Sequence, residues 1–375
     1  MIYLDYSATT PVNEEVLDSF VKCNKEYIGN PNSLHKLGIK SKEIIDSSTK
    51  QIKELLNLDN VDIIYTSGSS EANNLAIKGI CMKYQNRGKH IITTSLEHSS
   101  IYGPINYLID QGFEVSFVKL DENGLVDIDN LKELIRDDTI LVSINAVNSE
   151  IGIRQPIEKI GELLSLYPKI YFHADLTQII GKAKIDTSNI DLFSFTAHKF
   201  YGLKGIGCLV KKDKIIIEPM IHGGKSTTIY RSGTPTVALI ASLAKALRLA
   251  MENIDDKYNK ISELNNYLKD KLKEYDKVRI NSNDACIPQI LNISVLGVKP
   301  ETMLHALEND DIYISTQSAC SASNNISKAV FSVTNDEERS KSSIRISLSY
   351  LTTKDEIDKF LKSFDKCYKK LTNLR

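Results

Sequence analysis

Three short segments of the sequence place hydroxyl, acidic or basic side chains directly after an apolar run, and these residues could do chemistry. Residues 62–79, DIIYTSGSSEANNLAIKG, pass from an apolar run through small hydroxyl residues into a helical pattern. The unpaired backbone N–H groups at such a helix start, with hydroxyls beside them, form a seat for phosphate or another anion. On this segment alone, the alternative is that Ser70 is a plain helix N-cap.

The second and third segments carry an acid and a base. Residues 170–178, IYFHADLTQ, end an apolar run with Asp175, at the edge where open α/β sheets bind ligands. A carboxylate there is costly to desolvate unless a cation faces it; alternatively, Asp175 caps the next turn. Residues 192–207, LFSFTAHKFYGLKGIG, put Lys199 just after another apolar run. If it is enclosed, this amine has a lowered pKa and becomes a nucleophile able to form a Schiff base; alternatively, it is solvated at the turn.

The elements that must position these residues alternate between strand and helix patterns from about residue 60 to 210. Because strands separated by helices need crossover connections, the pattern predicts a mostly parallel sheet with helices on both faces, an α/β fold. The expected strands are 62–65, 90–93, 114–118, 140–144, 170–173 and 192–195, and the expected helices are 70–85, 101–111, 130–136 and 157–166.

The pattern changes after residue 236. Helical periodicity covers residues 236–273, and strand patterns at 278–281, 289–294 and 343–347 then mix with helices near Glu301 and Asp355. This change predicts a smaller α+β domain at the C-terminal end, and a chain of 375 residues is long enough for two domains. Residues 315–327, STQSACSASNNIS, are small and polar, which is typical of a mobile surface loop.

Composition limits the functional class. The chain has 47 basic and 48 acidic residues and is 42% hydrophobic, which is typical of a globular protein. With a net charge of −1 and no long apolar segment, we expect no direct nucleic-acid binding, no membrane span and no export signal. The six cysteines form no CxxC pair, which argues against a zinc site or a disulfide framework and predicts a reduced, cytoplasmic protein. No GxGxxG or complete Walker motif is present, so NAD and ATP are disfavoured.

A phosphate seat, a buried acid and an enclosed lysine at successive strand ends are the parts needed to hold pyridoxal phosphate. At this point the sequence resembles the cysteine desulfurases of the NifS/IscS kind, within the class V aminotransferase superfamily of fold type I. The resemblance extends over nearly the whole chain, and its specificity comes from motifs occurring jointly and in order. These are IYLDYSATTP at 2–11, GNPNS at 29–33, TSGSSEANNLAIKG at 66–79, Glu97-His98, NSEIG at 148–152, HADLTQ at 173–178, TAHK at 196–199, RSGT at 231–234, SACSAS at 318–323 and SIRISL at 343–348.

The resemblance implies roles for particular residues around pyridoxal 5'-phosphate. Lys199 would hold the cofactor through a Schiff base and shuttle protons, and Asp175 would keep the pyridinium nitrogen protonated. His98 would stack on the ring and transfer protons; the alternative is a helix-start histidine without a role. The remaining implied contacts are Gln178 with the phenolic oxygen, Ser69, Ser70, Thr196 and His198 with the phosphate, Thr234 with the phosphate from the partner subunit, and Arg345, Asn148 and Ser149 with the substrate.

Cys320 matches the catalytic cysteine of the family. The resemblance implies that its thiolate takes the sulfur of L-cysteine as a persulfide, leaves L-alanine, and delivers sulfur to an acceptor. It also implies a large domain with a mostly parallel seven-stranded sheet between helices at residues 16–254. A small α+β domain at 1–15 and 255–375 would carry the cysteine loop.

Three departures from the family pattern bear on these expectations. Ser149 replaces the second asparagine of an Asn-Asn-Glu-Ile-Gly motif, and a serine side chain is shorter with fewer donors. Residues 223–230, GGKSTTIY, lack the expected Glu and Arg, which puts the cross-subunit edge of the site in doubt. After Arg345, Leu-Gly-Arg becomes LSY at 348–350, and no long C-terminal tail follows for docking an iron–sulfur scaffold, so delivery by that route is not expected.

Three hypotheses follow for the function. The first is a homodimeric desulfurase that converts L-cysteine to L-alanine and passes sulfur to an acceptor protein for iron–sulfur cluster assembly or for tRNA or cofactor thiolation. The second keeps the cofactor but takes selenocysteine, cysteine sulfinate or another amino acid, as Ser149 suggests. The third is a catalytically impaired NifS-like protein that only binds the cofactor or acts as a scaffold.

Overall fold

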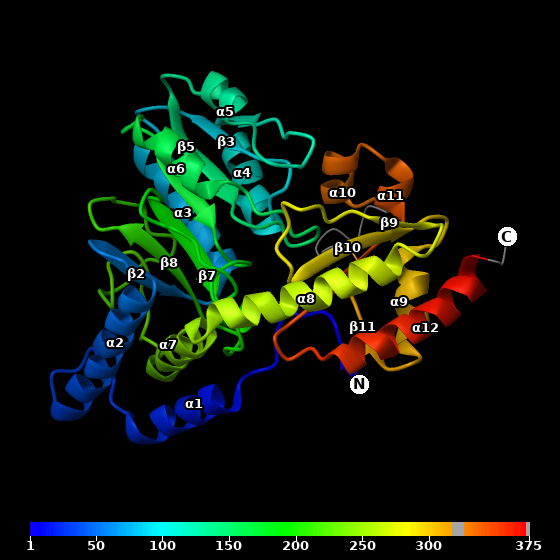
Figure 1. Ribbon diagram of the computed structural model, residues 1–375. Helices are drawn as coiled ribbons and strands as arrows, with labels where there is room; N and C mark the ends of the chain where they lie inside the picture. The colour runs from blue at the N-terminus through cyan, green and yellow to red at the C-terminus, as the bar shows by residue number, and fades with distance from the viewer. Residues whose placement is uncertain (317–325, 373–375) are drawn as a thin grey trace.

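The computed structural model describes residues 1–316 and 326–372, and its centre is a seven-stranded mixed sheet with helices on both faces (Figure 1). The strand order is β2-β8-β7-β6-β5-β3-β4, and every pair from β7 to β4 is parallel, while β8 runs antiparallel to both of its neighbours. The strands are β2 (Val61–Thr66), β3 (His90–Thr93), β4 (Glu114–Phe117), β5 (Thr139–Asn145), β6 (Tyr171–Asp175), β7 (Leu192–Thr196) and β8 (Gly207–Lys212). The expected α/β class with a mostly parallel seven-stranded sheet is confirmed.

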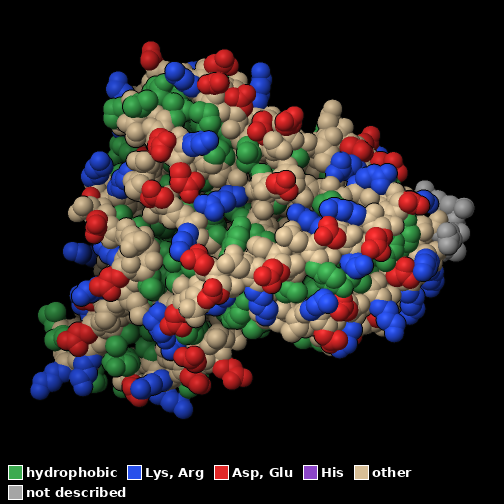
Figure 2. Space-filling model, viewed as in Figure 1, with side chains coloured by type: hydrophobic (Ala, Val, Ile, Leu, Met, Phe, Trp, Pro, Cys, Tyr) green, Lys and Arg blue, Asp and Glu red, His purple; other side chains and the backbone are tan. Residues whose placement is uncertain are grey.

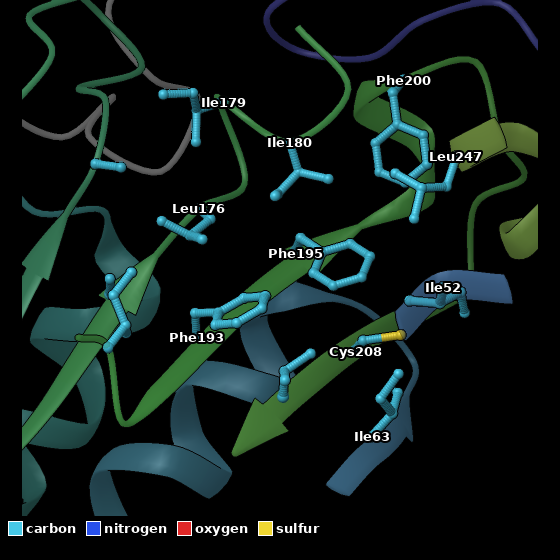
Figure 3. Packing of buried hydrophobic residues seen from close by; sticks show 14 of the residues in the cluster. Ile52, Ile63, Leu176, Ile179, Ile180, Phe193, Phe195, Phe200, Cys208 and Leu247 are labelled. Carbon is cyan, nitrogen blue, oxygen red and sulfur yellow. The ribbon is translucent and has the colours of Figure 1, made fainter. Parts of the chain in front are cut away.

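The central strands are buried along their whole length, as the apolar runs of the sequence require of strands covered on both faces. Figure 3 shows Phe193 and Phe195 on one face of β7, packed with Leu176 and Ile180 from the segment after β6. The helices of this part are α1 (Glu14–Glu26), α2 (Lys36–Leu55), α3 (Ser69–Tyr84), α4 (Ser99–Asp110), α5 (Ile128–Leu134), α6 (Ile157–Ser165), η1 (Ala197–Lys199) and α7 (Val237–Met251).

A second hydrophobic cluster gathers the first residues of the chain with its C-terminal part. Ile2 and Leu4 pack there with strands and helices from residue 261 onward. Its sheets have the orders β12-β10-β9, antiparallel, and β1-β11, parallel. The elements are β1 (Ile2–Tyr3), α8 (Ile254–Leu272), β9 (Val278–Ile280), β10 (Ile290–Val295), α9 (Pro300–Glu308), β11 (Ile312–Tyr313), α10 (Lys328–Thr334), α11 (Glu337–Lys341), β12 (Ser343–Ser347) and α12 (Lys354–Thr372).

Strand β8 and the helices before β2 are among the elements that sequence periodicity missed, as are the short β1, β11, α10 and α11. Residues 207–212 follow the glycine-rich turn and return antiparallel beside β7, so that a strand lies where a turn alone was expected. Helices α1 and α2 expose several apolar side chains, which blurs a simple amphipathic pattern. The other elements of the α/β part agree with the predicted ones to within about two residues, the usual uncertainty of helix and strand ends.

Charged side chains of both signs are interspersed over the face seen in Figure 2, as expected for a chain with a net charge of −1. Within residues 1–316 and 326–372, no helix combines the length and the apolar character needed to cross a bilayer.

Candidate functional site

A cavity of about 370 Å³ lies at the carboxyl ends of β5, β6 and β7, where ligands of open α/β sheets bind. The start of α3 and the N-terminal segment close it on two sides, and one residue of β12 reaches it from the C-terminal part. Its lining includes nine of the predicted site residues: Ser69, Ser70, His98, Ser149, Asp175, Gln178, His198, Lys199 and Arg345.

The predicted phosphate seat is the first turn of α3. Gly68, with φ of +159° and no side chain, is the N-cap, so the alternative of Ser70 as the cap is wrong; Ser69 and Ser70 lie inside the helix and line the cavity. A Cβ at Gly207 would meet the backbone of Gly68 at 2.7 Å, so this turn packs directly on β8. Several N–H groups at the start of a helix and two hydroxyls therefore face the cavity, an arrangement that suits an anion.

Asp175 ends β6 and is buried in the cavity wall. Its Oδ1 accepts the backbone N–H of Thr177 at 3.0 Å, and its Oδ2 accepts a hydrogen from Asn73 Nδ2 at 2.9 Å. The carboxylate thus caps the following turn and also faces the cavity, so the two alternatives for Asp175 coexist. Among the described residues, no lysine or arginine forms an ion pair with it. A cationic group of a ligand would supply the missing partner.

Lys199 lies in the 3-10 turn after β7, and its ammonium is held by backbone oxygens rather than by a carboxylate. Its Nζ donates to the carbonyls of Ser7 at 2.7 Å and Ala8 at 2.8 Å. Burial, and next the charge of Arg345, lower the pKa of this amine from 10.5 to about 8, against the opposite influence of Asp5 and other carboxylates. Lys199 is therefore an enclosed lysine with an appreciable fraction of neutral amine near neutral pH, as nucleophilic chemistry needs.

His98 is the N-cap of α4, and its imidazole takes the place of the usual serine or aspartate. Its Nδ1 accepts the backbone N–H of Ser100 at 3.2 Å and lies 2.9 Å from the Ser100 hydroxyl. Burial lowers the pKa of His98, so the ring is neutral near neutral pH. The histidine therefore has a capping role in addition to lining the cavity.

Arg345 comes from the buried strand β12 and is only 3% exposed, so it is not a surface ion pair. One nitrogen, Nη2, meets Asp5 Oδ1 at 2.8 Å, and Nη1 donates to the backbone carbonyl of Ser149 at 2.9 Å. Its Nε is buried and has no hydrogen-bond partner among the described residues. A guanidinium with a spare donor at a cavity wall suits a carboxylate ligand.

Gln178 and His198 occupy the wall beside Lys199. The amide of Gln178 donates from Nε2 to the Ser7 carbonyl at 3.0 Å and accepts at Oε1 from Lys182 Nζ at 2.6 Å. His198 Nδ1 lies 3.1 Å from the Thr9 hydroxyl, and burial lowers its pKa to about 4, so this imidazole is neutral. Both side chains thus face the cavity uncharged.

Three predicted residues, Asn148, Thr196 and Thr234, are not part of the cavity lining. Asn148 borders a neighbouring hollow of about 820 Å³, which shares Leu96, His98 and Ser149 with the cavity. The Thr196 hydroxyl donates to the Ile206 carbonyl at 3.0 Å, and Thr234 is exposed and absent from the cavity lining. Cys320 lies outside the described residues.

Sequence reasoning missed the N-terminal segment and the buried asparagines. Asp5, Ser7 and Ala8 line the cavity. They lie next to Ile2 and Leu4, which pack in the second hydrophobic cluster with the C-terminal part of the chain. Asn145 also lines it, with an Oδ1 that is buried and has no partner. The motif IYLDYSATTP was the available signal for the first group, because its polar residues directly follow a short apolar run. No local signal marked Asn145.

These features fit pyridoxal phosphate. The cavity combines an enclosed amine, a carboxylate without a cation, an anion seat at a helix start, and two orphaned buried atoms, Arg345 Nε and Asn145 Oδ1. An aldehyde, a pyridinium nitrogen, a phosphate and an amino-acid carboxylate would each find a chemically complementary group there.

Comparison with known proteins gives the family. The sequence family described as aminotransferase class-V matches residues 2–360. The chain belongs to this family. Class V aminotransferases use pyridoxal 5'-phosphate, so the cofactor expected from the sequence is that of the family.

One relative and two solved structures are similar to this chain over most of its length. A cysteine desulfurase IscS of Enterobacter sp. (strain 638) is 42% identical over 370 residues, which cover 96% of this chain and 91% of the relative. A solved structure described as a NifS-like protein has a TM-score of 0.92 and 31% identity, with 100% of both chains covered. Another, described as SspA in complex with cysteine, has a TM-score of 0.82 and 30% identity, covering 94% of this chain and 100% of that one.

Proposed function

We propose that this chain is a pyridoxal-phosphate-dependent cysteine desulfurase, which converts L-cysteine to L-alanine and keeps the sulfur as a persulfide on Cys320. The observation that carries the proposal is the environment of Lys199, whose amine is enclosed, faces two backbone carbonyls, and has a pKa lowered to about 8. Full-length similarity to cysteine desulfurases supports the same reaction, as does a similar structure that holds cysteine.

The cofactor would be held by residues that each match one of its parts. The amine of Lys199 would bind its aldehyde carbon, and Asp175 would face the ring nitrogen as the anion that keeps it protonated. Ser69, Ser70 and His198 would contact the phosphate, and Gln178 would donate to the phenolic oxygen. When bound, the cofactor supplies an electron sink for the carbanion at the substrate α-carbon.

The substrate would be oriented by Arg345. Its Nη2 and Nη1 already bind Asp5 and the Ser149 carbonyl, which fixes the plane of the guanidinium and leaves its other N–H groups, Nε–H among them, as donors. A planar guanidinium is the fitting partner for a substrate carboxylate. Because Asp5 shares this guanidinium, the substrate carboxylate would compete with Asp5 for it.

Lys199 and His98 would transfer protons. Burial lowers the pKa of both groups, so each is at least partly unprotonated near neutral pH. The thiolate of Cys320 would attack the substrate sulfur, forming an S–S bond while the C–S bond breaks, and the electron pair of that bond goes to the carbon side. A proton then completes alanine. The 820 Å³ hollow shares Leu96, His98 and Ser149 with the cavity, so there is free space directly beside it.

The test is direct. Purified full-length protein loaded with pyridoxal phosphate is mixed with L-cysteine and a reductant, and sulfide and alanine are measured. We expect equal amounts of both, and loss of sulfide in Cys320→Ala; Cys286→Ala is the matched control, since Cys286 lies outside the cavity lining. No sulfide from the wild type, or undiminished sulfide from Cys320→Ala, would contradict the proposal.

A different amino-acid substrate is the second candidate, and Ser149 favours it. The residue borders both hollows, and its carbonyl, rather than its side chain, holds Arg345. A serine there offers fewer contacts to a substrate than the asparagine usual in the resembling family. A panel of cysteine, selenocysteine and cysteine sulfinate, compared by kcat/KM, decides between the two candidates.

Assembly and delivery are further parts of the proposal. We propose a homodimer in which Thr234 of one protomer reaches the other's phosphate, and an acceptor protein that takes sulfur from Cys320. The exposed position of Thr234, away from its own cavity, supports this arrangement.

We also propose domains at 16–254 and at 1–15 with 255–375, supported by the separate hydrophobic clusters. Light scattering and limited proteolysis test these two points.

A further inference from the structure

A network of buried polar side chains lies directly behind His98 and Asp175. Asn73 of α3 is fully buried, and both the nitrogen and the oxygen of its amide have hydrogen-bond partners. Nδ2 donates to Asp175 Oδ2 at 2.9 Å and to Ser100 Oγ at 2.9 Å, and Oδ1 accepts from the hydroxyl of Ser194. Neither Asn73 nor Ser100 belongs to the site predicted from the sequence.

The orientation of the Asn73 amide follows from its neighbours. A carboxylate only accepts hydrogen bonds, so the amide nitrogen must face Asp175. The second hydrogen on that nitrogen points to Ser100, whose hydroxyl oxygen therefore acts as an acceptor. The Ser100 hydroxyl hydrogen is then free to be donated elsewhere, and His98 Nδ1 lies 2.9 Å away.

The position of the hydrogen on the His98 ring follows in turn. The backbone N–H of Ser100 points at Nδ1 from 3.2 Å, and a backbone N–H can only donate. The Ser100 hydroxyl points at the same nitrogen. Nδ1 must therefore present a lone pair, and the hydrogen of the neutral ring is on Nε2.

We propose that Asn73 and Ser100 are positioning residues that hold His98 as the neutral imidazole with its hydrogen on Nε2. His98 then presents Nε2–H as a hydrogen-bond donor, and a proton taken up by the ring would go to Nδ1 and displace the hydrogen bonds made there. This inference deepens the proposed function and rests on it for its catalytic meaning. It assigns a role to two residues in helices α3 and α4 that do not touch the cavity chemistry themselves.

The groups around His98 determine whether its pKa rises or falls when the Asn73–Ser100 network is weakened. The carboxylates of Asp175 and Glu150 favour the protonated ring, whereas burial and the Lys199 ammonium oppose it. Hydrogen bonds donated to Nδ1 exist only while that nitrogen is unprotonated. The network therefore lowers the pKa of His98, as burial does. Weakening the network should raise the pKa of His98.

His35 provides an internal reference. It caps α2 in the same manner, with Nδ1 accepting the backbone N–H of Gly38 at 3.2 Å, but it is exposed at the surface and lies far from Asn73 in the sequence. A change in the Asn73 network should therefore alter the signals of His98 and leave those of His35 unchanged.

The experiment uses full-length protein labelled with ¹⁵N in its histidine rings, with and without pyridoxal phosphate, and His98→Gln assigns the His98 signals. In the wild type we expect a hydrogen on Nε2 and none on Nδ1 at neutral pH. Ser100→Ala and Asn73→Ala should raise the pKa of His98 by about half a unit to one unit, the effect of one hydrogen bond. The matched controls, Ser99→Ala and Asn74→Ala, replace neighbours on the solvent side and should leave it unchanged.

Two outcomes overturn the inference: a hydrogen on Nδ1 in the wild type, or a His98 pKa that Ser100→Ala leaves unchanged. If Asn73→Ala fails to fold, Ser100→Ala carries the test, because it removes only one hydroxyl. The nuclear magnetic resonance measurement does not depend on turnover, so failure of the proposed function appears separately, as a wild type that produces no sulfide. With turnover present, the acidic limb of the kcat–pH profile should move upward with the His98 pKa in Ser100→Ala.

Discussion

Lys199 and Lys211 are two enclosed lysines at opposite ends of the antiparallel pair β7–β8, and their partners differ. The side chain of Lys211 is 0% exposed, and its Nζ meets Asp62 Oδ2 at 2.6 Å and lies 4.7 Å from the ring centre of Tyr230. Within residues 1–316 and 326–372, Lys199 Nζ donates to the carbonyls of Ser7 and Ala8 and has no carboxylate partner. Burial lowers the pKa of Lys199, and no carboxylate among the described residues forms an ion pair with this amine, whereas the Lys211 ammonium is paired with Asp62.

Lys199→Ala should remove the reactive amine of this comparison, and we expect it to have the largest effect. We expect turnover of L-cysteine to fall by at least about 10²–10⁴-fold, because the residue both holds the cofactor and transfers protons. The absorbance of bound cofactor and the sulfide output measure it. A variant that keeps a borohydride-reducible link to the cofactor would show that Lys199 is the wrong lysine.

Asp62→Asn should remove the ion pair of Lys211, the lysine of this comparison that is paired with a carboxylate. It leaves the buried Lys211 ammonium without its carboxylate, and breaking such a pair by removing one partner costs about 3–5 kcal/mol. Since Asp62 is 42% exposed, we expect the lower end of that range. Chemical denaturation of the cofactor-free protein measures the loss. Unchanged stability would show that the backbone carbonyls near Lys211 suffice.

The pH dependence of aldehyde capture by Lys199 sharpens the comparison. Capture needs the neutral amine, so its rate should rise about tenfold per pH unit below pH 8 and level off above the pKa of about 8. The native pKa is below the unfolded value, so the unfolded chain binds more protons between pH 8 and 10.5, and stability from this group rises with pH across that window. Borohydride trapping of a simple aldehyde follows the rate, with Lys199→Ala as the blank. A rate still rising at pH 10 would disagree.

Lys211→Met should have the smallest effect. It removes the ammonium and keeps an unbranched apolar side chain of about the length of the lysine stem, and the remaining Asp62 carboxylate reaches water. We expect a change in unfolding free energy within about 1 kcal/mol and nearly unaltered turnover. Denaturation and the sulfide assay measure both quantities. A large loss of turnover would mean that the two lysines are functionally linked.

The elements of the large sheet were predictable because their signals are local. Buried strands such as 90–93 and 139–145 are nearly continuous apolar runs, and the helices between them have clear periodicity. Strand β8 was not predicted, since its antiparallel return depends on pairing with both β7 and β2. The surface-ion-pair alternative for Arg345 could be rejected only once β12 was seen to be buried.

The sequence alone predicted which residues could carry chemistry and which strand ends present them, because an apolar strand followed by polar residues puts those residues at one sheet edge. Only the tertiary structure decided their partners. The carbonyl of Ser7 reaches Lys199, Asp5 meets Arg345, and Asn73 joins Asp175 to Ser100. These contacts join residues far apart in the chain, and local periodicity contains no information about which distant groups share a cavity. The reactivity of the site depends on these contacts, because burial and neighbouring charges set each pKa.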